Sequence, residues 1–327
     1  MKKLFFVLLI GTLTSLSYGQ KDMTEYNLYV TKADSLYDAK DYKASAKAFQ
    51  LAFDSNDGKG VPRDRYNAAC SFALSGETEK AFYHLLYCST HPKIKYKNYD
   101  HITTDSDLSS LHENVLWEKL ILEVKANKDE YEKDFDKPLV AILDSIYQSD
   151  QGYRRQIGEI EEKYGRDSKE MMEHWKFINE TDSINLIQIK EILDERGWLG
   201  PNVVGNRGNS TIFLVIQHAD LETQINYLPM MREAVQLGNA RASSLALLED
   251  RVALRQDKRQ IYGSQIGRDP ETGEFYVSPL IEPEKVNDRR AEVGLSSIED
   301  YIKHWDMTWD LEKHKERTEK IEAAEKD

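Results

Sequence analysis

The chain has 327 residues and a formal net charge of −13, with 57 acidic against 44 basic side chains. So acidic a balance argues against nucleic-acid binding, which needs a basic surface to replace the counterions of the phosphates. The length is sufficient for two domains with separate cores. After the N-terminus no segment is apolar enough to cross a bilayer, so we expect no transmembrane segment.

Residues 1–19 have the pattern of a secretory signal peptide. Two lysines precede an apolar run at residues 4–10, and Ser17 and Gly19 place small residues at the positions that signal peptidase reads. We therefore expect cleavage before Gln20 and export to the periplasm or the cell exterior. An uncleaved membrane anchor is the alternative, which the shortness of the apolar run disfavours.

The two cysteines, Cys70 and Cys88, have two interpretations. An exported protein meets an oxidising compartment, where a disulfide can form. We prefer the second interpretation, in which both are small apolar residues buried in helices.

An internal repeat begins the mature chain. Its two copies place small and large apolar residues at equivalent positions with constant spacing: Ser45 with Ala81, Phe49 with Leu85, and Ala52 with Cys88. Small residues allow two antiparallel helices to approach closely, and the larger ones fill the space between helix pairs. The pattern resembles tetratricopeptide repeats, although the Trp and Pro of that consensus are missing. We expect residues 20–125 to form this domain, with a capping helix at 108–124 and a surface for a protein or peptide partner.

A highly charged segment at residues 126–137, followed by Pro138, is interpreted as the linker. Residues 138–305 are expected to form a second helical domain, and residues 306–327 a charged, frayed tail. The helices are expected at 139–147, 153–164, 168–196, 211–219, 221–237, 241–257, 284–293 and 296–304. Residues 200–208 are expected to be a loop, and residues 262–280 a small β-hairpin turning at 269–273. The fold class is therefore mainly α, with tetratricopeptide-like helical hairpins followed by a helical domain with one small hairpin.

Asp182 lies at the centre of the apolar stripe of the helix at 168–196. A carboxylate there is costly unless a cation or several donors meet it, so we expect a partner among His218, Arg251 and Arg255. Three interpretations are open. Asp182 belongs to a functional site, or it is a buried clamp between helices, or the helix overhangs the domain and leaves it wet.

His218 ends an apolar helix, where the helix dipole favours a protonated ring. In the catalytic interpretation His218 is a general acid or base, Asp182 or Asp250 orients it, and Arg251 holds an anionic substrate group. In the structural interpretation, which is the commoner case for a lone histidine, its hydrogen bonds are satisfied within the fold.

Further polar residues complete the candidate pocket. Asp250 and Arg251 lie between two apolar strips of one helix, so we expect them to be partly buried and paired. Gln217, Tyr262 and Gln265 join Arg251 as candidate ligand-binding residues. We expect neither metal nor cofactor, since no two histidines stand four residues apart and the cysteines are not close in sequence.

The same polar residues carry a resemblance to a known family. The motifs are Gly197-Trp198, Gln217-His218-Ala219-Asp220, Leu248-Glu249-Asp250-Arg251-Val252 and Tyr262-Gly263-Ser264-Gln265. Together they resemble the bacterial domain-of-unknown-function family 6624 over residues 138–305. The resemblance implies a mainly helical domain and marks its distinctive polar positions, but it implies no mechanism.

These observations give a leading function and two alternatives. The leading interpretation is an exported two-domain binding protein, with the repeats as partner surface and a polar pocket in the second domain. The first alternative is a hydrolase-like enzyme of the cell envelope, which uses His218 with Asp182 or Asp250 and Arg251. The second is purely structural, with the polar groups satisfying one another.

Overall fold

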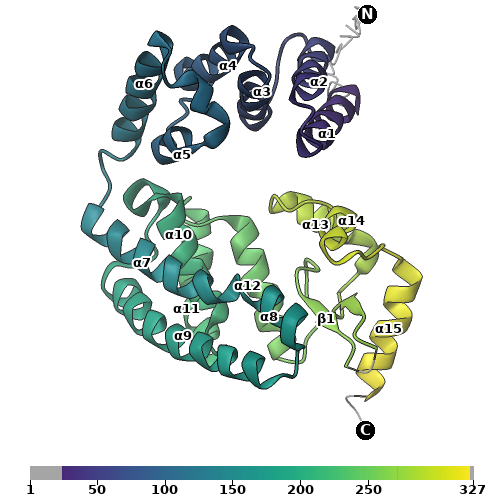
Figure 1. Cartoon of the computed structure of the whole chain (residues 1–327). Coiled ribbons are helices and arrows are strands. Elements are labelled where there is room, and N and C mark those ends of the chain that lie inside the picture. Colours follow the sequence, from purple (N-terminus) through teal and green to yellow (C-terminus); the bar gives the residue numbers. More distant parts are fainter. Residues whose placement is uncertain (1–23, 271, 325–327) are drawn as a thin grey trace, which may run out of the picture. The chain divides into compact units, whose positions relative to one another are not determined.

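The computed structural model describes residues 24–270 and 272–324 (Figure 1). The expected signal peptide at 1–19 lies outside these residues. The described chain divides between Lys133 and Asp134 into two compact units. Apart from a two-stranded antiparallel sheet and short 3₁₀ turns, its regular elements are α-helices, which confirms the mainly α fold class. Among the described helices, none combines the length and the apolar character of a bilayer span.

The first unit is an array of helical hairpins. Its elements are α1 (Thr24–Asp38), α2 (Tyr42–Ser55), α3 (Pro62–Leu74), α4 (Thr78–Thr90), α5 (Tyr99–Thr104), η1 (Ser106–Leu111) and α6 (Val115–Tyr131). Helix α1 packs on α2 and α3 on α4, and the small residues of the repeat lie fully buried at these crossings. There the hydroxyl of Ser45 donates a 2.8 Å hydrogen bond to the carbonyl of Ala33. The close approach expected from small residues is thus present.

The end of the first unit differs from the expected elements. Asn114 caps α6 by accepting from the N–H of Leu116, which interrupts the helix expected at 108–124. Helix α6 then continues through Tyr131, so the first residues of the expected linker are helical. Lysine and glutamate are good helix formers, so a charged segment does not by itself mark a linker. Cys70 and Cys88 are both buried and free.

The second unit is built around α7 (Lys137–Arg154), which packs against α9 (Lys169–Arg196) and α10 (Pro201–His218). Its other helices here are α8 (Ile157–Tyr164), α11 (Leu221–Gln236) and α12 (Ala242–Arg255). Asp220 caps α11 by accepting a 2.7 Å hydrogen bond from the N–H of Thr223. Apolar residues of α7, α9, α10, α11 and α12 share one core.

The expected loop at 200–208 is wrong, because α10 begins at Pro201. Gly205, with φ of 70° and ψ of 170°, kinks the helix and joins its two straight parts. Only glycine adopts this conformation at low cost. The glycine that suggested a loop therefore allows a kink within the helix. Gly208 serves close packing, since a Cβ there would lie 3.0 Å from Leu143 Cδ1 on α7.

The C-terminal part contains the expected hairpin and an unexpected helix. Strand β1 (Ile266–Arg268) pairs antiparallel with β2 (Phe275–Val277), and Ile266 faces Val277. The later elements are η2 (Pro283–Lys285), α13 (Val286–Glu292), α14 (Ile298–Ile302), η3 (Lys303–Trp305) and α15 (Leu311–Ala324).

The expected frayed tail is wrong over the described residues, because it contains α15. His314 and Thr318 of α15 are buried. Glu322 forms an ion pair with Arg259 at 2.6 Å. The charges of the tail lie on the outer face of a docked helix.

Candidate functional site

The last turn of α7 carries a buried acid, Asp150, and a cation, Arg154. Leu139, Leu143 and Ile146 form the buried stripe of α7, and Asp150 continues it at helical spacing. The Asp150 side chain is only 2% exposed. Its Oδ2 accepts from the amide of Gln151 at 2.6 Å. A carboxylate on the core face of a helix requires such donors.

Arg154 joins two carboxylates. Its Nη1 and Nη2 donate to Oδ1 and Oδ2 of Asp182 at 2.8 and 2.6 Å. This two-point contact from α7 to α9 is the strong geometry for guanidinium and carboxylate. Nη1 also lies 3.3 Å from Oδ1 of Asp150. Asp182 therefore has the cationic partner expected for it, but that partner is Arg154 instead of His218, Arg251 or Arg255.

His218 meets Asp150 at the end of α10. Its Nδ1 lies 3.0 Å from Oδ1 of Asp150, and 17% of its side chain is exposed. An ionised carboxylate only accepts, so Nδ1 carries the hydrogen of this bond. Within the described residues Nε2 takes part in no hydrogen bond. The imidazole is therefore fixed through one nitrogen and presents the other.

The charge state of Asp150 results from opposing effects. Burial acts to raise the pKa of this carboxyl. The hydrogen bond and charge of His218, the amide of Gln151 and the charge of Arg154 outweigh it, so the pKa of Asp150 is lower than its ordinary value. Asp150 is thus an anion at neutral pH although almost no solvent reaches it.

Two arginines of α12 bind the carbonyl oxygens of the two residues that flank His218. Arg251 Nη1 donates to the carbonyl of Gln217 at 2.7 Å, and Arg255 Nη1 donates to the carbonyl of Ala219 at 2.7 Å. The last carbonyls of a helix lack partners within the helix, and cations are favoured there. Burial, then Arg255 and Arg154, lower the pKa of Arg251. Arg251 therefore holds the carbonyl that precedes His218, and it lies near two other cations, Arg154 and Arg255.

Asp250 holds a loop and does not contact His218 by any hydrogen bond in the described chain. Its Oδ1 accepts from the N–H groups of Ile261 and Tyr262 at 2.6 and 2.9 Å, and its Oδ2 from the N–H of Ser264 at 2.9 Å. Its pKa is raised by burial, against the effect of these three bonds. The expectation that Asp250 orients His218 is corrected, because three backbone donors already engage its two oxygens.

The remaining candidate residues frame the cluster. Gln265 Oε1 accepts from Arg251 Nε at 3.2 Å. Tyr262 contributes mainly its backbone, since its N–H binds Asp250 and its carbonyl accepts from Arg290 at 2.7 Å. Gln217 donates from Nε2 to the carbonyl of Leu247 at 3.3 Å. The polar residues chosen from the sequence thus form one connected neighbourhood, with roles that differ from those expected.

Two buried amide atoms in this neighbourhood lack a partner among the described residues, namely Oε1 of Gln217 and Nδ2 of Asn185. Asn185 is on α9, one turn after Asp182, and its Oδ1 accepts from Ser149 Oγ at 2.9 Å. An unpaired buried polar atom costs about 1–3 kcal/mol unless a water or ligand meets it. These atoms are therefore places where a bound molecule would gain hydrogen bonds.

Asp150, Asp182 and His218 each offer an atom within 4.8 Å of the others, which is close enough to hold a metal ion together. However, Arg154 already donates to both carboxylates. Its guanidinium supplies the positive charge that a metal would bring and repels a cation at the same place. The cluster is better suited to orienting the imidazole than to ligating a metal.

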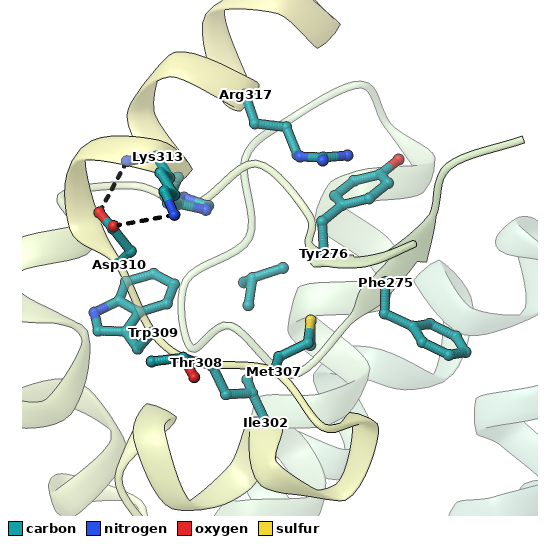
Figure 2. Close-up of a pocket in the computed structure, with 11 residues that line it drawn as sticks. Phe275, Tyr276, Ile302, Met307, Thr308, Trp309, Asp310, Lys313 and Arg317 are labelled. Carbon is teal, nitrogen blue, oxygen red and sulfur yellow. Dashed lines mark hydrogen bonds and ion pairs between the residues drawn. The ribbon is translucent and has the colours of Figure 1, made fainter. Parts of the chain in front are cut away.

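A separate pocket lies near the C-terminus and shares none of these residues. It has a volume of about 210 Å³ and lies between β2, the η3 region and the start of α15 (Figure 2). Arg317 lies over the ring of Tyr276 at 4.9 Å, and the same arginine pairs with Asp269 at 3.4 Å. Lys313 is 3.8 Å from Asp310. The cations of this pocket are balanced by acids.

Comparison with known proteins shows that the site lies within a region matched by one protein family. A model of DUF6624, described as a family of unknown function, matches residues 134–314. The resemblance inferred from the polar motifs is thereby confirmed, and the match extends beyond residue 305 into α15. No curated protein and no solved structure matches the chain.

Proposed function

Because the chain belongs to the DUF6624 family, whose function is unknown, we propose a function from the geometry of its family domain. The domain is an acid–base catalyst in which Nε2 of His218 exchanges a proton with the substrate. The observation that carries this proposal is the 3.0 Å contact between His218 Nδ1 and the buried, ionised Asp150. A histidine held through one nitrogen by a carboxylate has the tautomer and orientation that proton transfer requires.

The proposed reaction is hydrolysis. Nε2 of His218 takes a proton from a water molecule while the water oxygen forms a bond to an electrophilic centre of the substrate. The imidazolium then returns this proton to the leaving group as its bond to that centre breaks. Asp150 stabilises the imidazolium, and Arg154 keeps Asp150 ionised and in place.

The test compares His218→Gln with a matched control on a panel of chromogenic carboxylic esters, phosphate esters and glycosides. His304→Gln is the control, because His304 is an exposed histidine of the same unit. We expect hydrolysis of at least one substrate class, loss of that activity in His218→Gln and retention in His304→Gln. Equal activity of both variants and the native chain would contradict the proposal.

Nitrogen NMR provides a test that needs no substrate. In the neutral imidazole of His218 we expect the hydrogen on Nδ1 and a bare Nε2. The opposite tautomer would remove the base from the proposed reaction.

We also propose that the first unit is a tetratricopeptide-like array that binds a partner. Its consecutive hairpins with buried small residues support this proposal, because such arrays present elongated surfaces to peptides. Capture of a partner by the native chain, lost when the surface of α1 and α3 is altered, is the corresponding test.

Export is proposed from the first nineteen residues alone, and it would make the cell envelope the place of the reaction. N-terminal sequencing of the protein from the periplasm or the medium should begin at Gln20. An intact N-terminus in the cytoplasm would contradict export.

A further inference from the structure

The first unit contains a partly open cavity beside its apolar core. The cavity has a volume of about 300 Å³ and lies between α1, α2, α3 and the segment from α5 to η1. Its lining residues are Asp34, Tyr37, Asp38, Phe49, Tyr66, Asn67, Cys70, His101, Asp105 and Asp107. They combine carboxylates with aromatic rings.

The lining has an unbalanced negative charge. It includes four aspartates and neither lysine nor arginine. The charge of Arg63 acts on Asp34, but Arg63 forms an ion pair with Asp64 at 2.8 Å. Half-buried carboxylates without a cation raise the free energy of the fold, so a positive ligand would be attracted.

The bonds that the inner carboxylates do make come from neutral donors. Tyr66 donates its hydroxyl to Oδ2 of Asp105 at 2.9 Å, and Tyr37 donates to Oδ2 of Asp107. The N–H of Asp107 donates to Oδ1 of Asp105 at 3.1 Å. These bonds orient the carboxylates and leave their charges uncompensated.

The aromatic wall is fixed in place. Tyr66 stacks on Tyr96 with 5.2 Å between ring centres and lies 4.9 Å from His101. Tyr37 contacts the ring of Tyr42 at 5.5 Å. Ring faces attract cations, and they do so most strongly where water is excluded. Aromatic rings and carboxylates around one space are together the features that recognise an organic cation.

Cys70 lies at the buried side of the cavity and is 5% exposed. Burial, followed by Asp105 and Asp107, raises the pKa of its thiol, so the thiol stays neutral. Cys70, Asp105 and Asp107 are close enough to share a metal ion. A protonated thiol and tyrosine-bound carboxylates are weaker metal ligands than free thiolate and carboxylate, whereas the rings suit an organic cation.

We propose that this cavity binds the positively charged side chain of a lysine or arginine in a partner peptide. The inference rests on the proposed partner-binding role of the first unit and adds the chemistry of recognition. It is independent of the acid–base site of the second unit.

The test is calorimetric titration of the full chain with Nα-acetyl-lysine amide and Nα-acetyl-arginine amide. Nα-acetyl-norleucine amide is the neutral probe of similar shape. We expect binding of at least one cationic probe, none of the neutral probe, and weaker binding as salt is raised. Asp105→Asn and Asp107→Asn should each weaken binding by about tenfold or more, since each removes a charge that faces the ligand.

Asp54→Asn is the matched control, because Asp54 is an exposed aspartate of the same unit outside the cavity. It should leave binding unchanged, and thermal unfolding should show that all three variants fold. Equal binding of the neutral probe would overturn the cation inference while leaving partner binding intact. The cation inference also fails if Zn²⁺ or Mn²⁺ binds and neither organic cation does, or if no probe binds at all. Loss of partner capture with cation binding retained would overturn only the peptide role.

Discussion

Oδ1 of Asp150 accepts a 3.0 Å hydrogen bond from Nδ1 of His218, 68 positions further along the chain. Asp150→Asn replaces a pure acceptor with a group that also donates, which permits the wrong imidazole tautomer. We expect the turnover rate of the hydrolysed substrate to fall on the order of 10⁴-fold, as in comparable catalytic histidine–aspartate pairs. Asp144→Asn, on the same helix but outside the cluster, should retain activity. Nitrogen NMR of both variants would show whether only the first changes the tautomer.

Removal of Arg154 should create a metal site. In Arg154→Met the guanidinium that donates to Asp150 and Asp182 is lost, while the ligand atoms of Asp150, Asp182 and His218 stay close. We expect the variant to bind Zn²⁺ by calorimetry more tightly than the native chain. Arg155→Met, at the neighbouring exposed arginine, should not change the affinity. Equal Zn²⁺ binding by all three proteins would refute the view that Arg154 takes the place of a metal.

Asp250 should be more important for stability than for catalysis. Asp250→Asn leaves one oxygen for the three backbone donors of Ile261, Tyr262 and Ser264. We expect a loss of about 3 kcal/mol in the free energy of unfolding of the second unit. Asp257→Asn is the control, since Asp257 is an exposed aspartate close to Asp250 in the sequence. Denaturant titration measures both; an Asp250→Asn variant as stable as the control would contradict this role.

His84 should make the first unit sensitive to acid. Burial, then the charges of Arg65 and Lys80, lower its pKa from 6.5 to about 4. Because the folded value lies below the unfolded value, His84 contributes its full stability above pH 6.5. As the pH falls from 6.5 to 4, the unfolded state takes up the proton first and about 3 kcal/mol of stability is lost.

The His84 prediction is measured by hydrogen exchange of amides in α3 and α4 over this pH range. His84→Gln should flatten the dependence of stability on pH, because glutamine does not titrate. Glutamine can still accept the hydrogen bond that Arg65 donates, so the fold should be kept. His91→Gln, which alters a histidine that ends the same helix, should keep the native profile. Parallel profiles for His84→Gln and the native chain would exclude His84 as the source.

The kink of α10 should depend on glycine. A side chain at Gly205 would be strained by φ of 70°, and its Cβ would lie 3.0 Å from Phe135. We expect Gly205→Ala to lower the melting temperature of the second unit, with a cost of about 1–3 kcal/mol. Gly158→Ala, in the exposed part of α8 with open space, should be neutral or slightly stabilising. A melting temperature unchanged by Gly205→Ala would show that the kink tolerates a side chain.

The helical fold could be predicted from the sequence where apolar spacing was regular. The long helix to Arg196, the cap at Asp220 and the hairpin all followed from local patterns. Errors occurred where tertiary packing overrides local preference. Gly205 is tolerated within α10 because its neighbours pack on α7, and the charged residues of α15 surround two buried positions, His314 and Thr318.

The residues chosen from the sequence lie close together, but two members of the cluster were missed. His218 and Asp182 carried a visible signal, being polar groups on apolar helices. Asp150 and Arg154 were missed because α7 was expected to stop before them. The signal was present, since Asp150 continues the spacing of Leu143 and Ile146, and Arg154 follows one turn later. The pairing of these residues could not be derived, because it depends on how three helices cross.

The clamps from Arg251 and Arg255 have a consequence for recognition. Conformational freedom around His218 is lost once, when the chain folds, and does not have to be lost again at each encounter with a small molecule. A substrate would therefore meet an imidazole whose backbone is already held in place. Selectivity among candidate molecules would then arise from the side chains around Nε2, while the two guanidinium groups on the flanking carbonyls stay unchanged.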